Sequence, residues 1–257
     1  MLSTFNNNAC IFRSFVIEAK APLTNTSKTR SQKKKENKRL ESATKKFLKF
    51  CSYAGIGMSS LLGGYNGVQA GMNPAGCLVM AYVNGMGGGT LRNILQGERA
   101  YWLKSTRFAW WTLGWGTVGA LFWDPIKKHT GISEKGKWAL ALSLLSLGGN
   151  VCSGTQGGIR EGRDVWDRTI RGMIYSVLGA VGGGIVKDAF CKGRSTSLFP
   201  EGYANIFPAI TGSIAYQVGN SMGLSHPTLV GIGFGTSVPL RLYMDKQYKK
   251  KIALGKN

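Results

Sequence analysis

The sequence contains few of the side chains that build catalytic or metal centres. It has two histidines, His129 and His226, which are far apart and have no second metal ligand close by. The five cysteines are widely spaced and form no CxxC pair, so the sequence predicts neither a disulfide framework nor a zinc site. We therefore predict that the chain is not an enzyme and that it holds no cofactor and no metal.

Acidic residues are also scarce, at 12 Asp and Glu against 33 Lys and Arg, which gives a net charge of +21. The positive charge lies largely in two tails. Residues 1–49 hold 12 basic residues against three acids, and residues 241–257 hold six against one. Between the tails lies a body rich in glycine, tryptophan and leucine, so the mean composition describes neither part of the chain.

The N-terminal tail combines a targeting-like segment with a basic arm. Residues 1–20 are mainly apolar, with serine, arginine and one acid, as in organellar import sequences. Residues 24–46 are polar, which predicts a disordered or extended arm. Such an arm beside a membrane contacts anionic lipid, at about 1 kcal/mol per basic residue. It lacks the interleaved aromatic residues that stack on bases, so we expect no nucleic-acid partner.

Glycine is abundant, at 37 residues, but it shows no strict three-residue period, which excludes a collagen-like chain. Glycines within apolar helices allow the close backbone packing by which membrane helices associate. The composition therefore favours a bundle of membrane helices. Tryptophans near the ends of apolar segments, such as Trp102, Trp110 and Trp123, support this prediction, because indoles prefer the membrane interface.

Seven windows have the apolar content of membrane helices, although several are shorter than the usual 20 or so residues. Most contain polar residues, which are tolerated where they face other helices. The windows are 47–69, 74–96, 109–123, 138–157, 169–190, 203–222 and 228–244. We predict an all-α membrane protein with three parts: an arm at 1–46, a seven-helix domain at 47–244 and a basic tail at 245–257.

The strongest internal signal is a repeat. The segment 85–94, GMGGGTLRNI, aligns with 180–189, AVGGGIVKDA, at a shift of 95 residues. Three windows fit in each period, which gives repeats at about 47–123 and 138–222 and a final helix at 228–244. Because the number of helices is odd, the second repeat would be inverted relative to the first. Consecutive glycines let a helix unwind, so we expect the second and fifth helices to be broken at their triple glycines.

The residues around the two glycine triplets are the candidate pathway for an ion or solute. Arg92 and Lys187 each follow their triplet by three residues, and a charge at membrane depth normally faces a partner or a water-filled path. Alternatively, both side chains reach back to the membrane surface and have no role in transport. The candidate residues are Gly87, Gly88, Gly89, Arg92, Asn93, Gly182, Gly183, Gly184, Lys187 and Asp188.

The segments 72–103 and 177–213 resemble the two repeats of the prokaryotic trimeric intracellular cation (TRIC) channels, also described as glycine-transporter-like domains. In that family an apolar helix carries a triple glycine, two further residues and then Arg-Asp. The resemblance covers about residues 50–242. It implies three plus three inverted helices and a seventh, a homotrimer, and a pore in each protomer lined by the broken second and fifth helices.

The chain departs from the family pattern at the charged pairs. It has Arg92-Asn93 and Lys187-Asp188 where the pattern has Arg-Asp twice. Loss of the carboxylate at position 93 leaves the midplane more positive, which should disfavour the passage of cations. Lys187 keeps the charge of arginine but not its planar, two-pronged set of donors.

Two functions agree with these observations. The first is a channel or transporter for monovalent cations, such as potassium, or for a small solute. The second is a non-conducting accessory subunit of a larger organellar membrane complex that retains the fold. The N-terminal segment favours the mitochondrial inner membrane, with a plastid membrane as the alternative.

Overall fold

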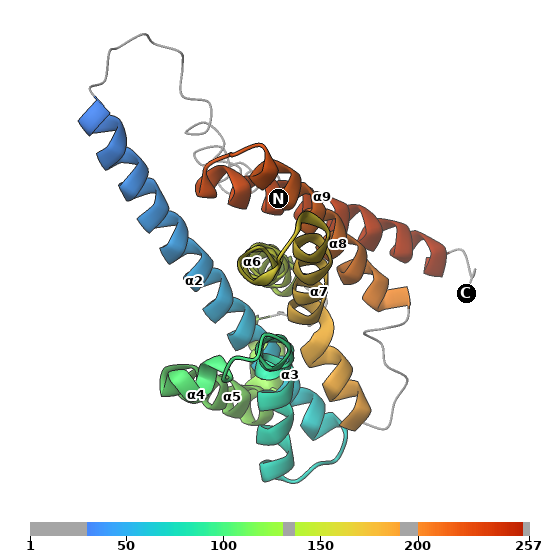
Figure 1. Cartoon of the computed structure of the whole chain (residues 1–257). Coiled ribbons are helices and arrows are strands. Elements are labelled where there is room, and N and C mark those ends of the chain that lie inside the picture. Colours follow the sequence, from blue (N-terminus) through green and yellow to red (C-terminus); the bar gives the residue numbers. More distant parts are fainter. Residues whose placement is uncertain (1–29, 131–136, 191–199, 254–257) are drawn as a thin grey trace. The chain divides into compact units, whose positions relative to one another are not determined.

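The computed structural model describes residues 30–130, 137–190 and 200–253, so the targeting-like segment 1–20 lies outside the described residues. The described residues form helices and no strand, which confirms the all-α prediction (Figure 1). The helices are α2 (Arg30–Gln69), α3 (Pro74–Leu95), α4 (Tyr101–Lys104), α5 (Thr106–Thr130), α6 (Lys137–Glu161), α7 (Val165–Phe190), α8 (Pro200–Ser221) and α9 (His226–Ala253).

Every helix except α4 overlaps one of the seven predicted windows. By length and hydropathy, α7 is the one helix in the described ranges that is apolar enough to cross a membrane by itself. That the other long helices cross a membrane stays a prediction. The chain divides into two compact units, residues 1–39 and 40–257, and the helix packing described below lies within the second.

The prediction of a disordered or extended arm is wrong from residue 30 onwards, because α2 begins at Arg30. Its first half contains no glycine or proline and is rich in lysine, glutamate and arginine, which are strong helix formers. Glu41 precedes Lys45 by four residues, a spacing that supports a helix. For the same reason α9 continues to Ala253, well into the predicted C-terminal tail.

The first repeat consists of α2, α3 and α5, which contact one another through glycines. Gly63 of α2 lies against Ala81 and Gly67 lies against Cys77, so α2 and α3 are antiparallel. Helices α2 and α5 are parallel. Gly57 of α2 lies beside Trp111 and Trp115 of α5, and Gly64, farther along α2, lies beside Gly116.

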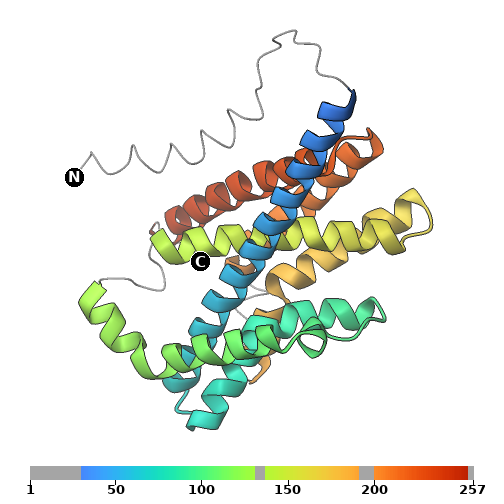
Figure 2. The same cartoon turned by 90° about the vertical axis from the view of Figure 1, so that its left-hand side faces the viewer.

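The second repeat consists of α6, α7 and α8 and has the same internal arrangement. Gly154 lies against Ser176 and Gly158 against Gly172, so α6 and α7 are antiparallel (Figure 2). Val151 packs with Ala209, and Thr155 donates a hydrogen bond to Ser213, so α6 and α8 are parallel. The last helix, α9, packs on α6 and α8.

The two repeats are inverted relative to each other. Gly55 of α2 contacts Ser146 of α6, and Gly149 of α6 contacts Cys51 of α2, so the first helices of the two repeats run in opposite directions. In each repeat the second helix is antiparallel to the first and the third is parallel to it. Since the two first helices run in opposite directions, all three helices of one repeat run opposite to their equivalents in the other. This is the relation that the odd number of helices in each repeat predicts.

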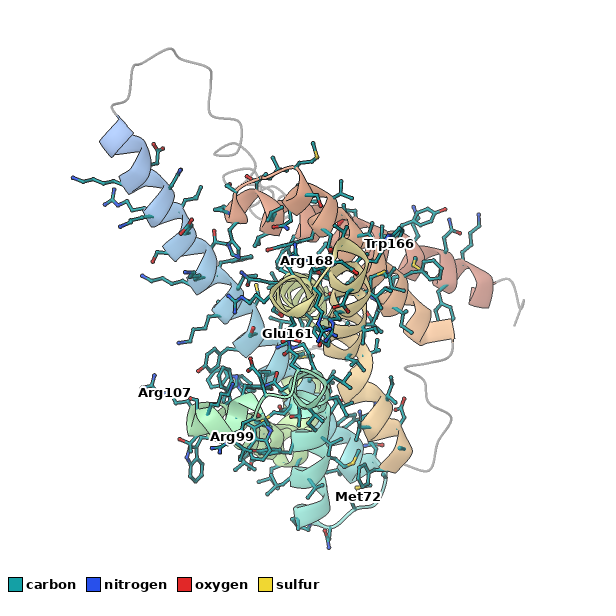
Figure 3. The ribbon with its side chains drawn as sticks, in the orientation of Figure 1. Met72, Arg99, Arg107, Glu161, Trp166 and Arg168 are labelled. Atoms are coloured by element: carbon teal, nitrogen blue, oxygen red, sulfur yellow. The ribbon has the colours of Figure 1, made fainter. Side chains whose placement is uncertain are left out.

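The turn between α6 and α7 is held by local contacts of charged side chains. Glu161 and Arg168, on its two sides, are labelled in Figure 3. Asp164 accepts a hydrogen bond at 2.7 Å from the backbone N–H of Asp167, in the first turn of α7. Asp167 in turn accepts one at 2.6 Å from the side chain of Arg171. The Arg168 side chain donates to the carbonyl of Gly162, and Glu161 accepts from the Tyr175 hydroxyl at 2.8 Å. These contacts fix the angle at which the two helices meet.

The predicted breaks at the triple glycines are not present. Both α3 and α7 continue as α-helix through their triplets, and the two triplets pack against each other. A Cβ atom at Gly88 would lie 2.5 Å from the carbonyl oxygen of Leu178, and one at Gly182 would lie 2.9 Å from the Cα of Gly88. The glycines therefore bring two helix backbones into contact and leave their hydrogen bonds intact.

This packing predicts opposite results for one substitution at two helical glycines. Gly88→Ala should lower the free energy of unfolding by about 1–3 kcal/mol, because the methyl group would overlap the α7 backbone. Gly114→Ala in α5 is the matched control, since a Cβ there meets nothing within 4 Å. It should leave stability unchanged or raise it by up to about 1 kcal/mol through helix propensity. Thermal unfolding in detergent measures both, and equal shifts would contradict the packing.

Candidate functional site

The two repeats line a partly open cavity of about 470 Å³ where α3 and α7 cross. Its wall comes mainly from α2, α3, α6 and α7, the first two helices of each repeat. Six of the ten predicted pathway residues line it: Gly88, Gly89, Arg92, Gly183, Gly184 and Lys187. The other four, Gly87, Asn93, Gly182 and Asp188, are outside the lining.

Two rows of polar side chains, one on α6 and one on α2, line the cavity. The sequence-based prediction did not include them. On α6 the row consists of Ser143, Ser146, Asn150 and Ser153, spaced three, four and three residues apart, so all four lie on one face. On α2, Ser52 and Ser59 are seven residues apart and also share a face. Polar residues at helical spacing in an otherwise apolar segment were the signal that could have identified them.

Arg92 points into the cavity from the last turn of α3. Its Nη1 donates a hydrogen bond of 2.9 Å to the hydroxyl of Ser153 on α6, which links the two repeats. In the part of the chain that the structure describes, no carboxylate lies within 4 Å of the guanidinium. A charged side chain in such a place normally faces a partner or water, and the Arg92 side chain faces the cavity.

Lys187 occupies the matching position in the second repeat and also lines the cavity. Its Nζ lies 3.3 Å from Oδ1 of Asp188. The Asp188 side chain is 7% exposed and does not line the cavity. Its carboxylate therefore stabilises Lys187 from the side that faces away from the cavity. The charge of Lys187 is therefore compensated within its own helix.

Asn93 makes a structural contact that the sequence did not predict. It is buried, at 5% exposure, and its Nδ2 donates a hydrogen bond of 3.2 Å to the backbone carbonyl of Arg99, just after the end of α3. Adjacent residues on a helix point about 100° apart. When Arg92 faces the cavity, Asn93 therefore faces the connection to α4.

One wall of the cavity is aromatic. Tyr101 of α4 packs against Gly89, where a Cβ would lie 2.6 Å from the ring. The Tyr101 ring meets Phe108 edge to face at 5.1 Å between centroids, and Phe108 stacks on Tyr53 at 4.6 Å. Both Tyr101 and Phe108 line the cavity, so the missing side chain of Gly89 lets an aromatic cluster close one side of it.

The charged side chains that line the cavity in the described ranges are all positive. They are Arg92 and Lys187, and no aspartate or glutamate in the described ranges contributes to the lining. The remaining polar side-chain groups are serine hydroxyls, the Tyr101 hydroxyl and the amides of Asn84, Asn150 and Asn205. Among the described residues, no group of three or more His, Cys, Asp or Glu side chains could hold a metal ion.

Inverted helical repeats around a polar cavity are an arrangement that many membrane transporters share. Residues 49–124 match the family model described as glycine transporter. A protein described as a UPF0126 membrane protein from Vibrio cholerae is 26% identical over 172 residues, which are 66% of this chain and 67% of that protein.

Solved structures agree with the sequence matches. A TRIC cation channel structure that describes conductance superposes with a TM-score of 0.67 at 22% identity, covering 78% of this chain and 93% of that chain. The TRIC trimeric intracellular cation channel orthologue from Rhodobacter sphaeroides gives 0.63 at 21% identity, covering 76% and 95%. A prokaryotic TRIC channel in 0.5 M KCl gives 0.61 at 18%, covering 78% and 96%. The chain has the TRIC fold, which confirms the resemblance seen in its glycine motifs.

The position of Asn93 predicts that restoring the family carboxylate would be harmful. Asn93→Asp removes the N–H donor to Arg99 and places a buried carboxylate beside a carbonyl oxygen, so it should cost about 1–3 kcal/mol of stability. Asn220→Asp is the control, since Asn220 is exposed at the end of α8. Thermal unfolding in detergent compares the two. An Asn93→Asp variant as stable as the control would show that the side chain does not depend on this contact.

Proposed function

We propose that this chain is an integral membrane channel or transporter and that its pathway is the cavity between α3 and α7. The observation that carries the proposal is the polar wall of this cavity at the centre of an inverted-repeat fold. Serine, asparagine and glycine line it on helices whose outward faces are apolar, such as Trp166, Ile170 and Ile174 of α7. Buried space of this polarity holds water, which is the medium an ion or small solute requires.

Cations are the cargo that the similar structures favour, since three of them are described as TRIC channels and two explicitly as cation channels. We propose monovalent cations in particular. The family model described as glycine transporter keeps a small solute as a second cargo. In either case Arg92 and Lys187 set the electrostatic barrier, because they are the charges that a solute meets in the lining. The proposed pathway passes between the two glycine triplets along the rows on α2 and α6.

A bulky residue in one of these rows tests the pathway. Ser59→Phe adds a ring to the cavity wall and should lower potassium flux from reconstituted liposomes by at least about fivefold, by narrowing the path. Thr117→Phe is the matched control, because Thr117 is exposed on α5 and lies outside the lining. Equal flux through both variants, with flux present in the unmodified protein, would place the pathway elsewhere.

A non-conducting accessory subunit is the second candidate, and the charge of the cavity favours it. Two basic residues and no described carboxylate in the lining make a poor path for cations. The assembly distinguishes the two functions. A channel of this fold should be isolated as a homotrimer, whereas an accessory subunit should be isolated with other proteins.

Native mass measurement after mild solubilisation gives the result directly. We expect about three times the 27.7 kDa chain mass, plus bound lipid. A stable complex with other subunits, together with no flux from the isolated chain, would establish the accessory function instead. The measurement requires no assumption about which ion is carried.

We propose an organellar membrane, with the mitochondrial inner membrane favoured over a plastid membrane, on the basis of the N-terminal composition. The basic first half of α2 and the basic end of α9 would then contact anionic lipid. Lys35, Lys38, Arg39, Lys45 and Lys46 of α2 are all exposed and available for such contacts.

A further inference from the structure

The cavity contains one more positive charge than its surroundings compensate. Lys187 and Asp188 form a pair that is neutral overall, with the two side chains 3.3 Å apart. Arg92 has no carboxylate within 4 Å in the described ranges, and its direct polar contact is the uncharged Ser153 hydroxyl. The carboxylate of Glu98 acts on Arg92 from farther away, but it is itself paired with Lys104 at 2.6 Å. Removing a guanidinium from bulk water without a counter-charge is costly, so the site favours an additional negative charge.

The groups around Arg92 are arranged to donate hydrogen bonds to such a charge. A guanidinium carries five N–H donors, and the Ser153 contact uses one of them. The Lys187 ammonium has three N–H donors, and Asp188 faces it from behind the cavity wall. The asparagine and serine residues of the lining add further N–H and O–H groups, whereas the described lining offers no carboxylate to repel an anion.

The size and charge of the site restrict the ligand. One uncompensated positive charge is balanced by one negative charge, which points to a monovalent anion. A volume of about 470 Å³ holds such an ion with several waters, since a water molecule occupies about 30 Å³. The walls near Arg92 are glycine backbone, short serine side chains and the Tyr101 ring with its hydroxyl. The polar groups among them suit a compact inorganic ion better than an acyl chain.

We propose that the cavity binds a small monovalent anion, of the size of a halide, at the Arg92 guanidinium. The anion replaces the counter-charge that Asp188 supplies to Lys187 in the second repeat and that Asn93, an uncharged amide, cannot supply in the first. Its occupancy makes the cavity neutral. This last consequence rests on the proposed transport function: a neutral cavity passes potassium more easily than a positive one, so the anion would act as a resident cofactor of conduction.

Chloride binding to the purified full chain in detergent tests the site without requiring transport. The linewidth of the ³⁵Cl NMR signal reports weak chloride binding, with methanesulfonate as the background anion. We expect excess broadening for the unmodified protein and for Arg92→Lys, and binding about tenfold weaker for Arg92→Gln, which loses a charged hydrogen-bond donor. Arg171→Gln is the matched control, because Arg171 pairs with Asp167 and lies outside the lining. Equal broadening in Arg92→Gln and the unmodified protein would overturn the proposal.

A second measurement does not depend on the folding of any variant. Crystals of the unmodified chain grown or soaked in sodium bromide should show anomalous scattering from bromide within hydrogen-bond distance of Arg92. No bromide in the cavity, or an elongated lipid in its place, would overturn the proposal even if bromide binds elsewhere on the protein.

Flux measurements separate this proposal from the proposed function. With a protonophore present to balance charge, potassium flux from liposomes should fall at least about fivefold when potassium gluconate replaces potassium chloride on both sides. Flux that is equal in both salts would overturn the role of the anion in conduction while leaving the channel function standing. No potassium flux in either salt, together with Arg92-dependent chloride binding, would overturn the proposed cation conduction and leave the anion site standing.

Discussion

The contact between the glycine triplets of α3 and α7 is the constraint on which the rest of the structure depends. Gly88 and Gly182 bring the two backbones within reach of each other, and this approach sets where the following turn of each helix lies. Arg92 and Lys187 occupy those turns, so both reach one cavity. The same principle governs the other helix pairs, in which Gly63, Gly154 and Gly158 each face the neighbouring backbone directly. A bundle held in this way gains little from hydrophobic burial between its helices, and its stability depends on close packing.

Much of the fold could be predicted from the sequence, because its strongest signal is a repeat. The shift of 95 residues fixed the equivalence of the two halves, and an odd number of helices in each half implies inversion. The continuity of α3 and α7 could not be predicted, since consecutive glycines permit two outcomes. They can let a helix unwind where water satisfies the backbone, or let two helices touch where another backbone replaces water. The outcome depends on what packs against the glycines. A single sequence does not show that the α7 backbone packs against Gly88.

The site was predictable in part for a related reason. Arg92 and Lys187 were identified by their spacing from the glycines, and both line the cavity. Asn93 was assigned to the same pathway because it is adjacent in sequence, although adjacent positions on a helix point in different directions. The serine and asparagine row of α6 was missed because each member is unremarkable alone. The start of α2 was missed because lysine and glutamate are typical both of disordered arms and of exposed helices.

The inverted repeats produce a site with symmetric positions but asymmetric charge. Asn93 and Asp188 are equivalent in the repeat, and both are buried, at 5% and 6% exposure. The carboxylate of Asp188 lies beside Lys187, whereas the amide of Asn93 is bound to the carbonyl of Arg99. The first repeat therefore retains an uncompensated charge that the second repeat does not have. Because both basic side chains face one cavity, this charge acts on any solute that enters it. Under the proposed function, a cation would pass at low cost only if a negative group from outside the described lining balanced Arg92.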